Sequence, residues 1–311
     1  MNTSAEHLPR GRNVAVAVAV DSRLREPAGM DYAAESVFQP ANLLREARRQ
    51  RNLPDQPVPR VCLLDPDGDI AAHLADTGRG HRHAGWACYH TDMWVTDLAG
   101  TAVGVVGRAV GAPFAVLVAE QLFASGADLV VSITSAGQLQ PLADPPYFVL
   151  IDQSIRDEGT SIHYLPAAPW SLLPGHLKAR LEPAMHDLAE PVITARSWTT
   201  DAPYRETRAA IASAVQRGAT CVEMEASALY ALAEARGYDI VCLAHITNTM
   251  AVTENDFEKG EANGVHAALA VTSHIARTLT APGHPPLAST RALERPARAA
   301  RGSGGDETDW V

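Results

Sequence analysis

The sequence lacks the features that mark nucleic-acid-binding and membrane proteins. Its 311 residues carry a formal net charge of −10, and no stripe of Lys and Arg interleaved with aromatic residues appears, which argues against binding to a phosphate backbone. No apolar run approaches the roughly 20 residues that a membrane span requires. We therefore expect a small-molecule partner, with no nucleic acid and no membrane among the partners.

Cysteine pairs and cofactor motifs are lacking as well. Four cysteines lie scattered in apolar segments without metal-ligand or redox spacing, so we interpret them as reduced core residues, which predicts a cytoplasmic protein. They are Cys62, Cys88, Cys221 and Cys242. The sequence shows no metal-binding cluster and no internal repeat, and its GRAVGA stretch lacks the spacing of a dinucleotide-binding loop. We expect neither a metal nor an organic cofactor.

The composition favours one large α/β domain between two ends of different character. The chain is 46% hydrophobic and 20% charged, enough to bury a full core. Residues 1–30 are expected to form an N-terminal extension, whose apolar run over 14–20 is interpreted as a strand or a loosely held segment rather than a signal sequence. Residues 283–311 are rich in Ala, Arg, Gly and Pro, which predicts a disordered tail. The domain then covers 31–282.

Short β-branched runs alternate with longer amphipathic runs through this domain. Strands are predicted at VCLLD, TAVGVVG, DLVVSIT, YFVLIDQSI, VITARSW, TCVEM and DIVCLAHIT, and helices at PFAVLVAEQLFASG, RETRAAIASAVQRG, ASALYALAEARG and over about 257–281. The alternation predicts an α/β three-layer sandwich, in which helices cover both faces of a central mixed sheet.

Small and polar residues follow five of the predicted strands. The segments are VGRAVGAP, ITSAGQLQP, TTDAPYRET, EMEAS and ITNTM. Because ligands gather at the carboxyl ends of the strands in such sheets, the five segments predict a cleft for a polar ligand.

Taken together, EMEASAL, SITSAGQLQP, GRAVGAPFAVLVAEQL and TTDAPYRET resemble the nucleoside phosphorylase superfamily, over about residues 37–279 and in the family's order. The motifs look most like those of uridine phosphorylase. The resemblance implies cleavage of an N-glycosidic bond, with Glu225 on the ribose hydroxyls, Met224 on the sugar face and Glu223 lining the site. A carboxylate there would stabilise the positive charge that develops on the sugar. Without the other motifs, Glu225 would be read as favouring the N-terminus of the following helix.

The phosphate site implied by the resemblance is only partly present. Ser135 matches the phosphate-binding hydroxyl and Gly137 the turn glycine beside it, but Gly68 and Ser132 stand where the family has arginines. Two alternatives follow. Either Arg108 supplies the missing cation, and then lies within hydrogen-bonding reach of Ser135, or water is the nucleophile and the acidic stretch DPDGD holds it.

The resemblance also assigns residues around the base and the neighbouring subunit. Asp201, Tyr204 and Glu206 are candidates for base-side or loop contacts. Asn248 stands where purine-specific relatives have a general acid, and since an amide cannot donate a proton at neutral pH, it favours a uridine-like leaving group. Two further candidates lie in segments that the family uses near a neighbouring subunit: Gln39 and His90.

These assignments lead to one expected activity and two alternatives. The first expectation is phosphorolysis of a uridine-like nucleoside, with inorganic phosphate as co-substrate, by a homodimer or hexamer. The alternatives are hydrolysis, because the phosphate-binding arginines are missing, and nucleoside binding without turnover. The residues proposed to act in catalysis are Glu225, Asn248 and Arg108.

Overall fold

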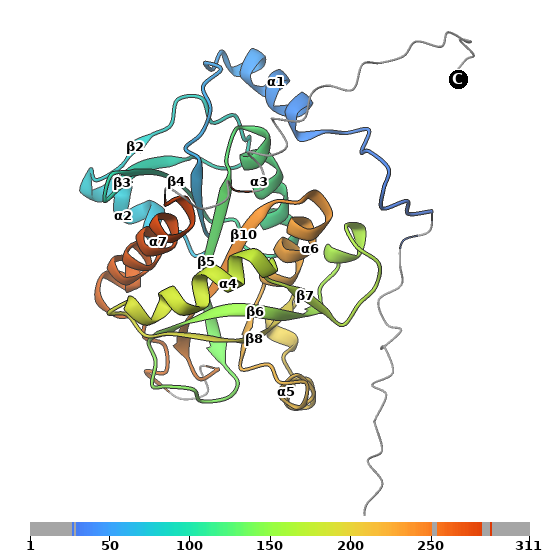
Figure 1. Cartoon of the computed structure of the whole chain (residues 1–311), viewed down its shortest axis with the longest axis vertical. Coiled ribbons are helices and arrows are strands. Elements are labelled where there is room, and N and C mark those ends of the chain that lie inside the picture. The colour runs from blue at the N-terminus through green and yellow to red at the C-terminus, as the bar shows by residue number, and fades with distance from the viewer. Residues whose placement is uncertain (1–26, 28, 251–253, 282–286, 288–311) are drawn as a thin grey trace, which may run out of the picture.

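The computed structural model describes residue 27, residues 29–250, residues 254–281 and residue 287. The predicted N-terminal extension and disordered tail lie almost entirely outside these residues. The described part is a mixed α/β structure with one large sheet and helices packed around it (Figure 1).

Ten strands form the sheet, in the order β10-β6-β8-β9-β5-β1-β4-β3-β2, and β7 pairs with β6. Parallel and antiparallel pairs are mixed, as predicted. An additional pairing of β10 with β5 closes five strands into a ring, which the sequence pattern did not indicate. The bounds are β1 Val61–Asp65, β2 His81–Arg82, β3 Trp94–Leu98, β4 Thr101–Gly107, β5 Leu129–Gln138, β6 Tyr147–Asp157, β7 Trp170–Leu172, β8 Val192–Thr200, β9 Cys221–Glu223 and β10 Asp239–Asn248.

The helices form two layers against the sheet. Helices α1, α3 and α6 pack together, as do α2, α4 and α7; in Figure 1, α1 lies at the top, α6 to the right, α2 and α7 to the left, and α4 across the middle of the view. This arrangement confirms the predicted sandwich. The bounds are α1 Pro40–Arg51, α2 Asp69–Thr77, α3 Ala112–Ala124, α4 Gly175–Ala184, α5 Arg208–Gln216, α6 Ala226–Arg236 and α7 Val265–Thr280.

The central strands are apolar on both faces because helices cover both. All five residues of β1 are buried, and β5 and β10 are buried over nearly their whole length. The four cysteines are buried and free, in agreement with their interpretation as core thiols. In the described part of the chain, none of the helices has the length and apolarity needed to cross a membrane.

The last helix starts later than the sequence predicts. We expected a helix from about residue 257, but α7 begins at Val265, after the short 3-10 segment η4, Glu261–Gly264. Gly260 and Gly264 have positive φ, and so do Ala262 and Asn263. Since left-handed residues cannot continue a right-handed helix, the prediction was wrong for residues 257–264.

Gly264 is the tightest of these positions. At φ +75°, a Cβ on Gly264 would collide with the His245 ring and lie 2.6 Å from the Lys259 carbonyl oxygen. Gly264→Ala is therefore expected to lower the free energy of unfolding by more than Gly78→Ala. The latter has φ +66° and nothing within 4 Å, so only the backbone penalty of about 1–2 kcal/mol remains. Urea denaturation of both variants measures the difference, and equal losses would refute this packing at Gly264.

Candidate active site

Glu225 stands at the junction of β9 and α6, where it is the N-cap residue of the helix. Its side chain is buried, and Oε1 accepts a hydrogen bond of 2.7 Å from the backbone N–H of Gly111. Oε2 is buried and has no hydrogen-bond partner among the described residues. A buried acceptor without a donor is costly, so this oxygen is available for a ligand hydroxyl.

The carboxylate of Glu223 holds this junction in place. Its Oε2 accepts bonds of 2.7 Å from the backbone N–H groups of Glu225 and Ala226, and its Oε1 accepts from the hydroxyls of Ser197 and Thr199 on β8. Both oxygens are thus engaged by protein donors. The structure places Glu223 beneath the site, as the group that fixes the start of α6.

Burial makes Glu225 an unusual acid. It raises the pKa of Glu225 from 4.5 to about 8, and the nearby charge of Glu223 adds to the effect, while the Gly111 amide opposes it. Burial also raises the pKa of Glu223. Hydroxyl groups that donate to Glu225 would favour its ionised form, so binding of a sugar diol and ionisation of Glu225 support each other.

The Gly111 turn ties β4 to this carboxyl group. Gly111 has φ +85° and starts α3, and Met224 Cε lies 4.0 Å from the position of a Cβ on Gly111. Arg108, at φ 68°, donates its backbone N–H to the Asp65 carbonyl over 2.9 Å. Met224 is half-buried beside Glu225 and Gly111, where it can pack against a sugar.

Ser135 is half-buried on β5, and its hydroxyl donates to Oδ2 of Asp67. The Lys259 ammonium donates to the same oxygen over 2.8 Å and to Oδ2 of Asp69 over 2.5 Å. Lys259 was missed by the sequence reasoning. Its only signal was a lysine beside Gly260, shortly after the ITNTM strand end.

Arg108 does not bind Ser135. Its side chain is exposed, its Cγ packs against Gly68 where a Cβ would be only 2.7 Å away, and it has no side-chain hydrogen bond or ion pair within the described residues. The hydrogen bond to Ser135 that was expected if Arg108 supplies the missing cation is therefore absent among the described residues, where the Ser135 hydroxyl donates to Asp67. The guanidinium remains a free cation at the edge of the site.

Two further titratable groups border Asp67. Asp65 is buried and accepts from the backbone N–H groups of Gly68 and Ala71, and burial raises its pKa to about 6. His245 is paired in register with Ser135 and stacks on Phe148 with ring centroids 4.5 Å apart. Burial lowers the pKa of His245 to about 4, so this imidazole is neutral at physiological pH.

Asn248 and Gly137 meet where β10 and β5 pair across an irregularity. Oδ1 of Asn248 accepts from the backbone N–H of Met250 over 2.9 Å and lies 3.3 Å from the position of a Cβ on Gly137. The Met250 sulfur would be 2.8 Å from that Cβ, so a larger residue at position 137 would require the Met250 side chain to move. Asn248 and Gly137, both predicted site residues, therefore lie side by side, and Gly137 is two positions after Ser135 on β5.

Comparisons with known proteins decide the family. Residues 64–280, well over half of the chain, match the family described as Phosphorylase superfamily. The chain belongs to the phosphorylase superfamily. A stretch of 130 residues, 42% of this chain, is 32% identical to an uncharacterized protein of Acanthamoeba polyphaga mimivirus and spans 50% of that protein.

Solved structures share the fold. Uridine phosphorylase from Vibrio fischeri is 17–18% identical in two structures, each with a TM-score of 0.58 over 73% of this chain and 92% of that one. Purine nucleoside phosphorylase from Toxoplasma gondii, in complex with immucillin-H, is 16% identical with a TM-score of 0.62, over 78% of this chain and 95% of that one. At identities of 16–18%, this structural similarity shows that the chain shares the fold of these two enzymes.

Four predicted site residues are not joined to the Glu225 and Ser135 groups by any contact in the described chain. Asp201 accepts from the Gly159 backbone N–H over 2.8 Å, and the Tyr204 side chain is 99% exposed. His90 is exposed and packs edge-on against Phe114, 6.2 Å between ring centroids. Gln39 is the exposed residue before α1. Their roles remain predictions.

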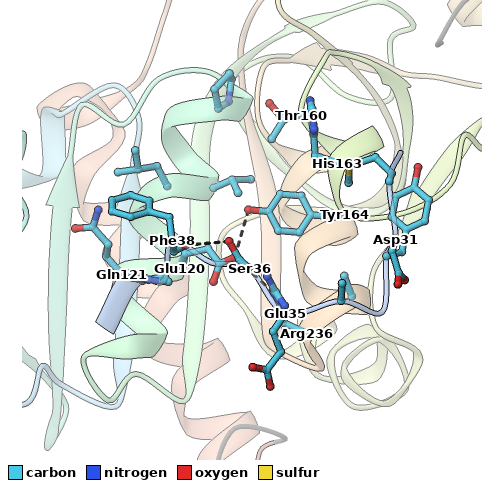
Figure 2. A pocket seen from close by; sticks show the side chains of 18 of the residues that line it. Asp31, Glu35, Ser36, Phe38, Glu120, Gln121, Thr160, His163, Tyr164 and Arg236 are labelled. Atoms are coloured by element: carbon cyan, nitrogen blue, oxygen red, sulfur yellow. Dashed lines mark hydrogen bonds and ion pairs between the residues drawn. The ribbon is translucent and has the colours of Figure 1, made fainter. Parts of the chain in front are cut away.

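A cavity of about 920 Å³ lies outside this site, between the segment that precedes and begins α1 and helices α3 and α6. Figure 2 shows Glu120 between Tyr164, whose hydroxyl donates to it over 3.2 Å, and Arg236, 3.7 Å away. None of the predicted site residues lines the cavity, and Arg236 is at the end of α6 opposite to Glu225.

Glu225→Gln tests the buried acid through stability. Since the folded pKa of about 8 exceeds the ordinary 4.5, the native state binds more protons than the unfolded state, and the wild type loses stability as pH rises between these values. Gln keeps an oxygen for the Gly111 N–H and cannot ionise. We expect the melting temperature of Glu225→Gln to exceed that of the wild type by a margin that grows from about pH 5 to about pH 8.

The control is Glu234→Gln, which removes an exposed carboxyl group from the same helix. Its melting temperature should follow that of the wild type over the whole pH range. A constant difference between Glu225→Gln and the wild type at all pH values would contradict the raised pKa.

Proposed function

We propose that this phosphorylase-superfamily chain cleaves the N-glycosidic bond of a nucleoside and transfers the sugar to water. The observation that carries the proposal is the hydrogen bond from Ser135 to Asp67. The hydroxyl that the resemblance assigns to phosphate is bound to a carboxylate, with Asp69 nearby and the Lys259 charge shared between both acids. The carboxylates of Asp67 and Asp69 would repel a phosphate anion, whereas a water molecule could donate hydrogen bonds to them.

The ribose would bind at Glu225. Its Oε2, which has no partner in the described part of the chain, would accept from the sugar hydroxyls, and Met224 would pack on the sugar face. As the bond to the base breaks, positive charge develops on the sugar, and the ionised Glu225 stabilises that charge more than it stabilises the ground state. Gly111 N–H holds the other oxygen and so fixes the direction of the carboxylate.

The base would lie beside Gly137 and Asn248. An amide donates no proton to a leaving purine, so we propose that uridine-like substrates, whose base leaves as a delocalised anion, react faster than adenosine or inosine. Asp201 and Glu206 are the candidate base-side groups on the segment after β8, and burial raises the pKa of Glu206 to about 7.

The experiment is incubation with uridine and adenosine, with and without inorganic phosphate, with separate assays for free ribose and ribose 1-phosphate. We expect free ribose, a rate indifferent to phosphate, and a higher rate for uridine. Asp67→Asn should lower the rate on the order of 10²-fold, because it removes the group that accepts the proton of water. Asp76→Asn, which alters an exposed residue on α2, is the matched control.

A second candidate is phosphorolysis, and it is favoured by the guanidinium of Arg108, which has no partner among the residues that the structure describes. If phosphate displaced Asp67 from Ser135, Arg108 beside Gly68 would be a cation able to bind it. Formation of ribose 1-phosphate, and its loss in Arg108→Ala, would establish this reaction instead. Ligand binding without either product would identify a nucleoside-binding protein.

We also propose that the chain acts as a homo-oligomer, in which a neighbour supplies Gln39 and His90 to the site. Exposed apolar side chains beside the large cavity support a contact surface: Val37, Phe38 and Leu117 are 100%, 71% and 39% exposed. Phe38→Asp should shift the sedimentation coefficient toward that of a monomer. Leu172→Asp, at an exposed apolar position on β7, should not. Equal behaviour of the two variants would argue against this surface.

A further inference from the structure

Lys259 reaches the site from a distant part of the chain. It lies between β10 and α7, 192 positions from Asp67, and its ammonium bridges Asp67 and Asp69 at 2.8 Å and 2.5 Å. The Lys259 side chain is only 18% exposed. Because Lys259 is largely buried and binds two carboxylates, its ion pairs with Asp67 and Asp69 are more stable than an isolated ion pair on the surface.

The contacts of Asp67 are all on one oxygen. Oδ2 accepts from the Ser135 hydroxyl and from the Lys259 ammonium, whereas Oδ1 has no partner in the described segments. A carboxylate fixed by two donors through one oxygen presents the other in a defined direction. The Asp67 side chain is 28% exposed, so solvent reaches it.

Lys259 keeps its charge in this setting. Burial lowers the pKa of Lys259, but the hydrogen bonds and charges of Asp67 and Asp69 outweigh burial and raise the pKa above 10.5. A cation at this distance favours the ionised form of a carboxylate. Lys259 thus supplies both the orientation and the charge that a general base needs.

We propose that Lys259 is a positioning residue for nucleoside hydrolysis, an inference that rests on the proposed function: it fixes Asp67 so that Oδ1 accepts the proton of the attacking water. The water oxygen forms a bond to C1′ of the ribose while the bond from C1′ to the base nitrogen breaks, and the electron pair leaves with the base. The proton on Asp67 then passes through solvent to the departed base. Lys259 touches neither substrate nor water in this scheme and acts through Asp67.

Other charges near Asp67 set the background for this role. The carboxylates of Asp65 and Asp69 disfavour an additional negative charge beside them. The cations of Lys259 and the exposed Arg108 favour such a charge. His245 is neutral above about pH 4 and adds no charge. The groups that border Asp67 from the packed elements are Asp65, Asp69, Arg108, Ser135, His245 and Lys259. Lys259 is the only one of them that neutralises Asp67 by direct contact.

The test measures free ribose from uridine in phosphate-free buffer as a function of pH, for the wild type, Lys259→Met and Lys259→Arg. Lys259→Met removes both the cation beside the proposed base and one of the two donors that fix its carboxylate, so the acid limb of kcat/KM should move up by about one pH unit or more and kcat should fall at least about 10-fold. Lys259→Arg restores a charge and should return the limb toward its wild-type position.

Lys178→Met is the matched control, because Lys178 on helix α4 also binds two carboxylates, those of Asp152 on β6 and Glu182 on α4. It should lower stability without moving the acid limb. A Lys259→Met enzyme that loses stability and rate but keeps the wild-type limb overturns the positioning role while the proposed hydrolysis stands. A wild type that releases no free ribose overturns the proposed function, and the role of Lys259 with it.

Discussion

The buried carboxylate of Glu223 is the group on which the rest of the site depends. It binds two hydroxyls of β8 and two backbone N–H groups at the start of α6, and so joins the strand, the helix and the turn between them. Glu225 takes its direction from this junction and in turn holds the Gly111 N–H at the start of α3. A buried carboxyl group is tolerated here because these donors, together with the Ser154 hydroxyl at 3.4 Å, compensate its loss of water.

The site is also rich in acidic side chains. Glu225 lies on the side where we propose that the sugar binds, with Glu223 beneath it, and Asp67 and Asp69 lie beside Ser135, the hydroxyl that the family resemblance assigns to phosphate. The cationic groups there are Lys259, already shared between two aspartates, and Arg108, which stands at the edge. This set of acceptors is the reason that we propose water, rather than phosphate, as the nucleophile.

Much of the fold could be predicted from the sequence. Strands that are covered on both faces appear as short apolar runs, and the EMEAS motif, with the other motifs, indicated the family and its fold. The closure of the sheet through β10 and β5 depends on pairing between distant strands and left no local signal. The start of α7 was misplaced because left-handed residues such as Ala262 and Asn263 are not recognisable from residue type. Lys259 was missed since its partners are 190 and 192 positions away, a separation that only the folded chain reveals.

The most direct measurement of the central claim is a crystal structure of the protein grown with a nucleoside analogue and saturating inorganic phosphate. The account predicts sugar hydroxyls on Glu225 Oε2, Asp67 still bound to Ser135 and Lys259, and a water molecule against Asp67 Oδ1. Phosphate bound between Ser135 and Arg108, with Asp67 displaced, would contradict it and identify the chain as a phosphorylase.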